Sequence, residues 1–483
     1  MTIEMPNNQS PHGLRNDCLS YEAVIAQSIL LLTPTAVPAN VLSLVFASAG
    51  NGTWLSFIIG MVGLLFVSFN INQFACRSAS PGSLYSYIIK GLGPHVGVLC
   101  AWALLLGYLF GAMAPLCAFA IFSQKLLGNI GFTTHTSILF ILVIVAACYV
   151  AFKDIRSTKI FIVVQGVCLA LVLLLCLIIL VKKGFAIDWN QLSLQGATPG
   201  GVTMGLVLVV FCFSGFESPT ALGDEAKNPL KTIPRAVTQS IIFCAIFYTI
   251  TTYIVVLGFS GINENLGKIE APLDFLAHQL GLDFLGLLIS IAVLVSYFFA
   301  ICGCINFTAR IFLSMSLHGW FHHSLGKTHD TNLTPHNAIA LSGFIILIIP
   351  SVFKVYGYDT FELQNYFGII CSFGFLVMYI LVSIAAPVYL FQLNKLKPID
   401  VLFAILAVIF MILPFIGTIG IPGSSLFPVP DFPQNILPYL VLMYFMAGFG
   451  WFLFQKKRYP KIVENMNNSI EEIHTRFSEQ ENL

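Results

Sequence analysis

The chain has 483 residues, of which 57% are hydrophobic and only 9% are charged, and its mean hydropathy is +0.87. Soluble domains carry about 25% charged residues, so this composition excludes an ordinary soluble protein. The 23 basic and 22 acidic residues leave a net charge of +1, so the chain has no basic surplus with which to bind nucleic acid. We therefore expect an all-α polytopic membrane protein.

Apolar runs of the length that crosses a bilayer recur along the chain. They predict twelve transmembrane helices, centred on residues 22–47, 52–75, 95–123, 134–152, 158–181, 201–222, 236–260, 282–312, 337–354, 362–391, 399–420 and 435–455. The stretch 264–280 is too polar to span, and its pattern favours a short amphipathic helix at the membrane interface.

The basic residues predict how the twelve helices are oriented. If both termini are cytoplasmic, 18 of the 23 Lys and Arg residues fall on the cytoplasmic side and 5 fall outside. This bias is the one expected from the positive-inside rule for an even number of spans. We therefore expect a multi-pass protein of the cytoplasmic (inner) membrane with both termini in the cytoplasm.

The first predicted span is interrupted at mid-membrane by Thr33-Pro34-Thr35-Ala36-Val37-Pro38. Each proline removes a backbone donor and clashes with the preceding turn. Because broken helices survive in a bilayer only where they line a cavity or pack within protein, this run predicts an unwound segment with a functional role.

The sixth predicted span is interrupted in the same way by Phe213-Ser214-Gly215-Phe216-Glu217-Ser218-Pro219. Glu217 is the acid that we place deep within a span. A carboxylate there is costly and usually marks the path of an ion or a substrate. The alternative is a structural glutamate that is protonated or paired internally.

The two breaks open two blocks of five spans each, which is the layout of an inverted-repeat transporter with two further helices at the end. Broken half-helices expose N–H groups at positive ends and C=O groups at negative ends. An amino acid carries both a carboxylate and an ammonium group, so the two breaks together suit such a ligand.

Three stretches of sequence resemble the amino acid–polyamine–organocation superfamily of secondary transporters. They are Gly215-Phe216-Glu217-Ser218 with the following 223–236 segment, Pro81-Gly82-Ser83-Leu84-Tyr85-Ser86-Tyr87 before the third span, and Asn306 to Arg310 with the following 314–319 segment. The resemblance implies a LeuT-like 5+5 inverted repeat plus two C-terminal helices. It also implies a secondary transporter of an amino acid or a related small amine, working as a proton symporter or an exchanger, and neither a cofactor nor a bound metal.

The resemblance divides the chain into four parts. They are a cytoplasmic N-terminal segment (1–19), a ten-helix transport core (20–392), the last two transmembrane helices (393–456) and a cytoplasmic tail (457–483).

The expected site residues form three sets. Those expected to bind the substrate are Thr33, Pro34, Thr35, Ala36 and Val37 in the first break and Phe213, Ser214, Gly215 and Phe216 in the sixth span. Those expected to act in coupling or gating are Glu217, Gln165, Tyr108 and Tyr297. A cytoplasmic gate is expected from Asp224, Glu225, Lys227, Arg235 and Arg310, whose opposite charges can form ion pairs.

The chain departs from the family pattern at two places. Thr35-Ala36-Val37 stands where the family's first span usually has a Gly-x-Gly break. Gln165 stands where some proton-coupled relatives have a lysine, and an amide does not titrate. Glu217 is therefore the better candidate for carrying a proton, and exchange without ion coupling is the alternative.

Three other readings compete with a transporter. A channel would line its pore with repeated rings of carbonyls or charges, and the sequence has no repeated filter motif. His318, His322 and His323 match part of a membrane desaturase histidine box, but such di-iron sites need about eight histidines at regular spacing. A non-transporting sensor on the same scaffold would keep the pocket, although no soluble domain is attached to relay a signal.

Overall fold

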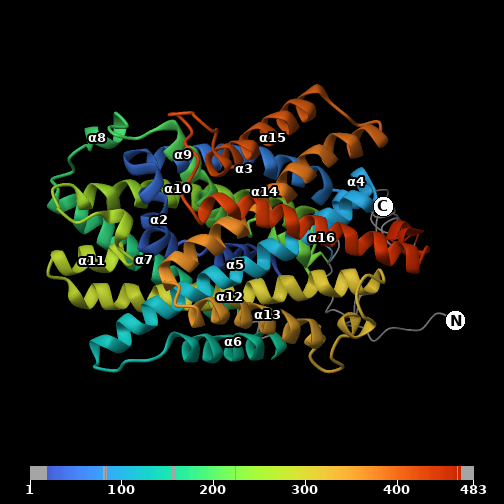
Figure 1. The fold of residues 1–483 in the computed structure, drawn as a ribbon, viewed down its shortest axis with the longest axis horizontal. Coiled ribbons are helices and arrows are strands. Elements are labelled where there is room, and N and C mark those ends of the chain that lie inside the picture. Colours follow the sequence, from blue (N-terminus) through green and yellow to red (C-terminus); the bar gives the residue numbers. More distant parts are fainter. Residues whose placement is uncertain are drawn as a thin grey trace.

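The computed structural model describes residues 19–79, 82, 84–153, 158–223, 225–464 and 466–468, with the side chains of 158–162 left aside. Within these ranges the chain is helical, and the long helices run roughly parallel to one another (Figure 1). The helices are α1 (Tyr21–Leu32), α2 (Leu42–Ala49), α3 (Thr53–Ala75), α4 (Leu84–Leu92), α5 (Pro94–Asn129), α6 (Thr136–Lys153), α7 (Thr158–Lys182), α8 (Trp189–Leu192), α9 (Pro199–Phe213), α10 (Pro229–Phe259), α11 (Pro272–Gln279), α12 (Asp283–Leu317), α13 (His336–Val355), α14 (Thr360–Gln392), α15 (Pro398–Ile419) and α16 (Leu437–Arg458).

Eleven helical segments of the described chain are long and apolar enough to cross a membrane. The first of them, Tyr21–Ala75, is 55 residues long and contains two of the predicted spans. Gly50 lies between these two spans with a positive φ of 52°, in the left-handed region that favours glycine. The all-helical polytopic fold is thus confirmed, while the count of twelve stays a prediction.

The packing of the helices follows the expected repeat. The first four spans each pack against the span that comes five positions later, in the pairs α2 with α9, α3 with α10, α5 with α12, and α6 with α13. These pairs form two groups, one built from α1, α2, α3, α9 and α10 and the other from α5, α6, α12 and α13. Helix α14 packs on α5 and α9, and α15 packs on α3, α9 and α14.

The two ends of the bundle carry different connections. One end, which we call the inner end, holds Leu19, α4 and the loop before α10. Here Leu19 and Ala226 form an isolated parallel bridge. The opposite end, called the outer end, holds α8 and α11 (Figure 1). Helix α11 lies within the stretch that was expected to form a short amphipathic helix.

Single cysteines can test the orientation of this bundle. Placed at Asn332 and Asn394, they should be labelled from the cytoplasmic side by a membrane-impermeant thiol reagent. A cysteine at Asn190 in α8 should be labelled from outside, because the positive-inside bias places the inner end in the cytoplasm.

The parent for this labelling should carry Cys76→Ser, because Cys76 is exposed in the described chain. The parent without an introduced cysteine gives the background signal. Labelling of Asn394→Cys from outside would contradict the predicted topology.

Candidate functional site

The first break lies where the sequence predicts it. Helix α1 ends at Leu32, and Thr33 takes a left-handed conformation with φ 45° and ψ 56°. After a turn at Pro34 and Thr35, the chain resumes as a π-helix over Val37–Val41. Because Pro34 has no N–H, the carbonyl of Leu30 accepts its hydrogen bond from the N–H of Thr33 instead.

The second break follows α9 and lies against the first. The chain leaves the helix at Ser214, passes through Gly215 with a φ of 99°, and continues as a 3₁₀ helix over Ser218–Leu222. A Cβ atom on Gly215 would lie 3.0 Å from the Cβ atom of Leu31, so the break packs directly on the last turn of α1. Glycine suits this position for both its φ and its lack of a side chain.

Tyr248 of α10 satisfies the ends of both broken helices. Its hydroxyl donates to the carbonyl of Leu32, the last residue of α1, and lies 3.3 Å from the carbonyl oxygen of Cys212 near the end of α9. Tyr248 is fully buried, so water cannot replace these contacts. Tyr248 was not predicted as a site residue, since nothing in its local sequence distinguishes it from other tyrosines.

A cavity of about 20 Å³ lies between the two breaks. The breaks contribute Thr33, Val37 and Ser214 to its lining, and the facing helices α5 and α12 contribute Tyr108 and Tyr297. Its other lining residues are Leu31, Val41, Gly111, Pro115, Phe211, Cys212, Ala300, Cys304 and Phe375. None of these side chains is charged at neutral pH. In this conformation the cavity has room for about one water molecule.

Glu217 lies beside this cavity, toward the inner end, and is fully buried. The hydroxyl of Tyr108 lies 2.8 Å from its Oε1 atom, and the hydroxyl of Tyr379 lies 2.9 Å from its Oε2 atom. Both carboxylate oxygens therefore have a hydroxyl partner. The three side chains, called the Tyr–Glu–Tyr cluster below, join α5, the second break and α14.

Asn40 holds a second polar cluster on the outer side of the cavity, where it is fully buried. Its Oδ1 atom accepts hydrogen bonds from the hydroxyl of Tyr297, at 2.7 Å, and from the amide of Gln364. Its Nδ2 atom donates to the carbonyl of Glu270 at 2.7 Å. This set, called the Asn40 cluster, ties the first span to α12, α14 and the loop before α11. Neither Asn40 nor Gln364 was predicted from the sequence.

Gln165 of α7 is buried near the first break. Its Oε1 atom accepts a hydrogen bond from the hydroxyl of Ser296 at 3.4 Å, and the Ser296 hydroxyl also bonds to that of Thr35. A neutral amide therefore lies next to the unwound segment, linked to Thr35 through Ser296.

At the inner end, an ion pair joins span eight to the loop that follows the second break. Nη1 of Arg310 lies 2.8 Å from Oε2 of Glu225, whose side chain is 1% exposed. Arg310 also donates to the carbonyl of Ala221 at 3.3 Å. The side chains of Lys227 and Arg235 are exposed, and Asp224 lies outside the described residues. Of the predicted gate residues, Arg310 and Glu225 therefore come together.

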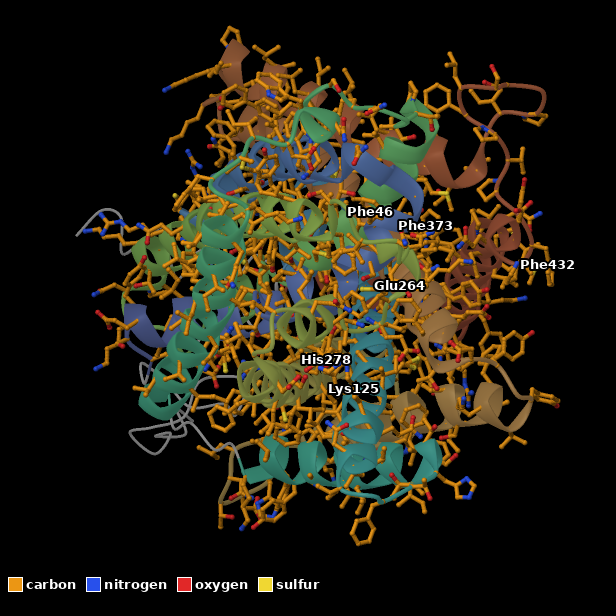
Figure 2. The ribbon with its side chains drawn as sticks, turned by 90° about the vertical axis from the view of Figure 1, so that its left-hand side faces the viewer. Phe46, Lys125, Glu264, His278, Phe373 and Phe432 are labelled. Atoms are coloured by element: carbon orange, nitrogen blue, oxygen red, sulfur yellow. The ribbon has the colours of Figure 1, made fainter. Side chains whose placement is uncertain are left out.

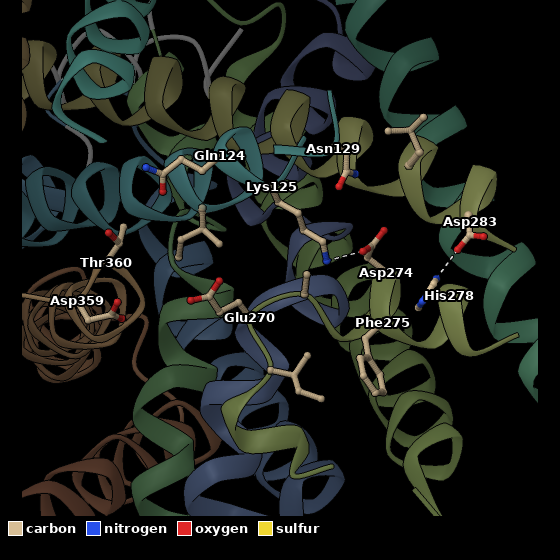
Figure 3. Close-up of a pocket in the computed structure, with 14 residues that line it drawn as sticks. Gln124, Lys125, Asn129, Glu270, Asp274, Phe275, His278, Asp283, Asp359 and Thr360 are labelled. Atoms are coloured by element: carbon tan, nitrogen blue, oxygen red, sulfur yellow. Dashed lines mark hydrogen bonds and ion pairs between the residues drawn. The ribbon is translucent and has the colours of Figure 1, made fainter. Parts of the chain in front are cut away.

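A larger cavity of about 790 Å³ opens at the outer end. Figure 2 looks onto this end, where Lys125 and His278 lie close together. In Figure 3, Lys125 pairs with Asp274, and His278 pairs with Asp283. This cavity, called the outer vestibule below, is also lined by Glu270, whose backbone carbonyl belongs to the Asn40 cluster.

Acidic groups predominate in the outer vestibule. The acidic residues that line it are Glu270, Asp274, Asp283 and Asp359. Lys125 is the one Lys or Arg residue in its described lining. Burial raises the pKa of Glu270, the nearby Asp359 charge adds to the rise, and Lys125 opposes it. The excess of acidic residues gives the vestibule a negative potential, which raises the local concentration of cations.

Several predicted binding residues are packed in this conformation. The ring of Phe213 lies against Tyr248, with centroids 5.1 Å apart, and the ring of Phe216 lies against Tyr379 at 5.2 Å. Ala36 is also fully buried. The lining of the small cavity includes none of the three, whereas their neighbours Thr33, Val37 and Ser214 line it.

The histidines of the loop after α12 do not form a di-iron centre within the described chain. No group of three or more His, Cys, Asp or Glu side chains that could hold a metal ion is present among the described residues. His318 instead places its Nδ1 atom 2.9 Å from the hydroxyl of Tyr85.

The fold and the site are those of a membrane transporter of small molecules. Residues 23–462 match the family model described as amino acid permease, so the chain belongs to the amino acid permease family. Members of this family transport amino acids or amines across membranes, and the chain is a transporter rather than an enzyme.

Known proteins are similar to this chain at low sequence identity. The branched-chain amino acid permease BcaP of Bacillus subtilis is 24% identical over 400 residues, which cover 79% of this chain and 80% of the relative. The low-affinity putrescine importer PlaP of Escherichia coli is 26% identical over 61% of this chain and 66% of the relative. The crystal structure of MhsT in complex with L-phenylalanine superposes with a TM-score of 0.54 at 14% identity, covering 81% of this chain and 98% of MhsT.

The Tyr–Glu–Tyr cluster makes a prediction about stability. Tyr108→Phe or Tyr379→Phe leaves one buried carboxylate oxygen of Glu217 without its partner. Each change should lower the apparent free energy of unfolding by about 1.5–3 kcal/mol, as measured by denaturation in detergent.

Tyr444→Phe is the matched control, because the hydroxyl of Tyr444 donates to the neutral backbone carbonyl of Trp102. It should cost about 0.5–1.5 kcal/mol. An equal, small loss in all three variants would contradict the pairing of Glu217 with the two tyrosines.

Proposed function

We propose that the protein carries an amino acid with an uncharged, apolar side chain across the membrane by alternating access, with the substrate held between the two helix breaks. The observation that carries this proposal is the cavity between the breaks. Its described lining combines the hydroxyl groups of Thr33, Ser214, Tyr108 and Tyr297 with apolar side chains from the breaks and the facing helices, and none of these lining residues is charged.

The broken helices suit both charges of an amino acid. The C-terminal ends of α1 and α9 are negative ends of helix dipoles and attract an ammonium group. The helical segments that follow each break begin with the positive ends of helix dipoles, which attract a carboxylate. Since these charges belong to the backbone, they recognise the zwitterionic part of the substrate and leave its side chain to the rest of the lining.

The lining favours an apolar side chain over a second amine. A diamine such as putrescine would bury a second ammonium group, which needs a carboxylate or several acceptors. Glu217 is the nearest carboxylate, and both of its oxygens already accept from tyrosines. Of the relatives BcaP and PlaP, the branched-chain amino acid permease BcaP therefore has the substrate class that fits this site better.

Alternating access would use the two polar clusters as barriers. A cavity of about 20 Å³ is smaller than any amino acid, so the helices around it must separate before a substrate can bind. The Asn40 cluster separates the cavity from the outer vestibule, and the Tyr–Glu–Tyr cluster lies between the cavity and the inner end. Opening one cluster while the other stays closed would expose the site to one side at a time.

Glu217 is the residue that we propose for any proton coupling. Gln165 cannot titrate, whereas Glu217 can load and release a proton as its tyrosine partners separate. The protein would then act as a proton symporter, and exchange without ion coupling is the alternative. We place it in the cytoplasmic membrane with both termini inside, as the positive-inside bias indicates.

Ala300 allows a direct test of the substrate site. Its side chain lines the cavity. Ala300→Leu fills space that the substrate needs, and overpacking costs about 1–3 kcal/mol, so the affinity for L-leucine should fall by about 10- to 100-fold. The measurement is counterflow uptake of labelled L-leucine in proteoliposomes, with L-lysine and putrescine as competitors expected to have little effect.

Ala292→Leu on the same helix is the control. Ala292 is buried but does not line the cavity, and its variant should transport as the wild type does. If putrescine or L-lysine competed as well as unlabelled L-leucine, the proposed substrate class would be wrong. If no substrate of any class accumulated, transport itself would be in question.

Glu217→Gln tests the proposed proton coupling. The amide keeps the shape of the protonated acid but cannot titrate, so the pH dependence of uptake should flatten while substrate still binds. Uptake should be measured from about pH 5 to 8 in both proteins. A pH profile of unchanged form, with normal turnover, would remove Glu217 from the coupling mechanism.

A further inference from the structure

A third cavity, of about 990 Å³, lies at the inner end between the loop after α12 and the segment that follows α16. We call it the basic pocket. Arg458 and Lys461 line it from the α16 side, and the loop contributes the rings of His318, His322 and His323. The described lining contains no aspartate or glutamate. The pocket therefore presents cations and N–H donors to whatever enters it.

The position of the pocket on α16 places it at the depth of lipid headgroups. Helix α16 is apolar until its last turn, where Lys456, Lys457 and Arg458 follow one another. Trp451 and Tyr459 line the pocket and are 42% and 50% exposed. Exposed Trp and Tyr next to Lys and Arg at the end of a span mark the interface between the hydrocarbon core and water.

The walls of the pocket are fixed by packing. Trp320 is buried, and its ring stacks on Phe452 with centroids 5.1 Å apart. The indole N–H of Trp320 lies 3.3 Å from the sulfur of Met466, and the indole N–H of Trp451 donates to the carbonyl of Trp320 at 3.4 Å. These contacts join the end of α12 to α16 and to the segment after it, so the cationic groups sit around a formed cavity.

We propose that the basic pocket binds the phosphate headgroup of an anionic phospholipid such as phosphatidylglycerol. The headgroup carries one negative charge and several acceptor oxygens, which match Arg458, Lys461 and the imidazole N–H groups. The acyl chains lie along α16, whose residues Leu442, Met446 and Leu453 are exposed. A soluble anion would use the same cations but would gain nothing from this apolar surface.

The test compares lipid retention in the full-length wild type and in the double variant Arg458→Gln/Lys461→Gln. Both side chains are exposed, so neither is needed for packing. The proteins are incubated with equal amounts of phosphatidylglycerol and phosphatidylcholine in detergent, and bound lipid is counted by native mass spectrometry. The wild type should retain phosphatidylglycerol preferentially. The double variant should bind it about 30-fold more weakly, which corresponds to about 2 kcal/mol for two cations near the surface.

Two further double variants distinguish binding in the basic pocket from a general effect of positive charge on the protein surface. Lys395→Gln/Lys397→Gln removes two exposed basic residues elsewhere and should leave retention unchanged. Arg458→Lys/Lys461→Arg keeps the charges and should preserve binding.

Three results would overturn the proposal. One is equal retention of phosphatidylglycerol by the wild type and the Arg458→Gln/Lys461→Gln variant. Another is equal retention of the two lipids by the wild type. The third is displacement of phosphatidylglycerol by millimolar inorganic phosphate, which would show that a soluble anion is the preferred ligand.

Discussion

The architecture depends on one constraint, namely that backbone polar groups freed by a broken helix in a membrane must find partners inside the protein. The first and sixth spans both break at the same depth, and Tyr248 provides a hydroxyl for the ends of α1 and α9. Because one side chain serves both breaks, α10 must pass alongside both of them. The two breaks are thereby held together, and the space next to them becomes the site.

Polar clusters close this site on both sides. The Tyr–Glu–Tyr cluster buries a carboxylate whose two oxygens are paired, and the Asn40 cluster buries two amides and a hydroxyl. Hydrogen bonds between buried polar groups are costly to lose, because the separated groups find no water inside the bundle. Such clusters therefore favour discrete closed and open arrangements over gradual loosening, which is what alternation between two access states requires.

The sequence predicted the features that depend on local chemistry. Proline and glycine located both breaks, and Glu217 was conspicuous because a carboxylate is costly within a span. The partners were not predictable, because they come from distant parts of the chain. Tyr379 is 162 residues from Glu217, and Tyr248 is 216 residues from Leu32. Phe213 and Phe216 were expected to contact the substrate but pack against Tyr248 and Tyr379 here, and these ring partners also come from distant parts of the chain.

The central claim is that the substrate binds between the two breaks, and a cryo-electron microscopy map of the protein with saturating L-leucine tests it most directly. The account predicts density for one leucine with its carboxylate and ammonium groups against the unwound segments at Thr33–Val37 and Ser214–Phe216, and with its side chain toward Tyr297 and Phe375. Ordered leucine in the outer vestibule, with a dry and closed cavity between the breaks in a preparation that transports leucine, would contradict it.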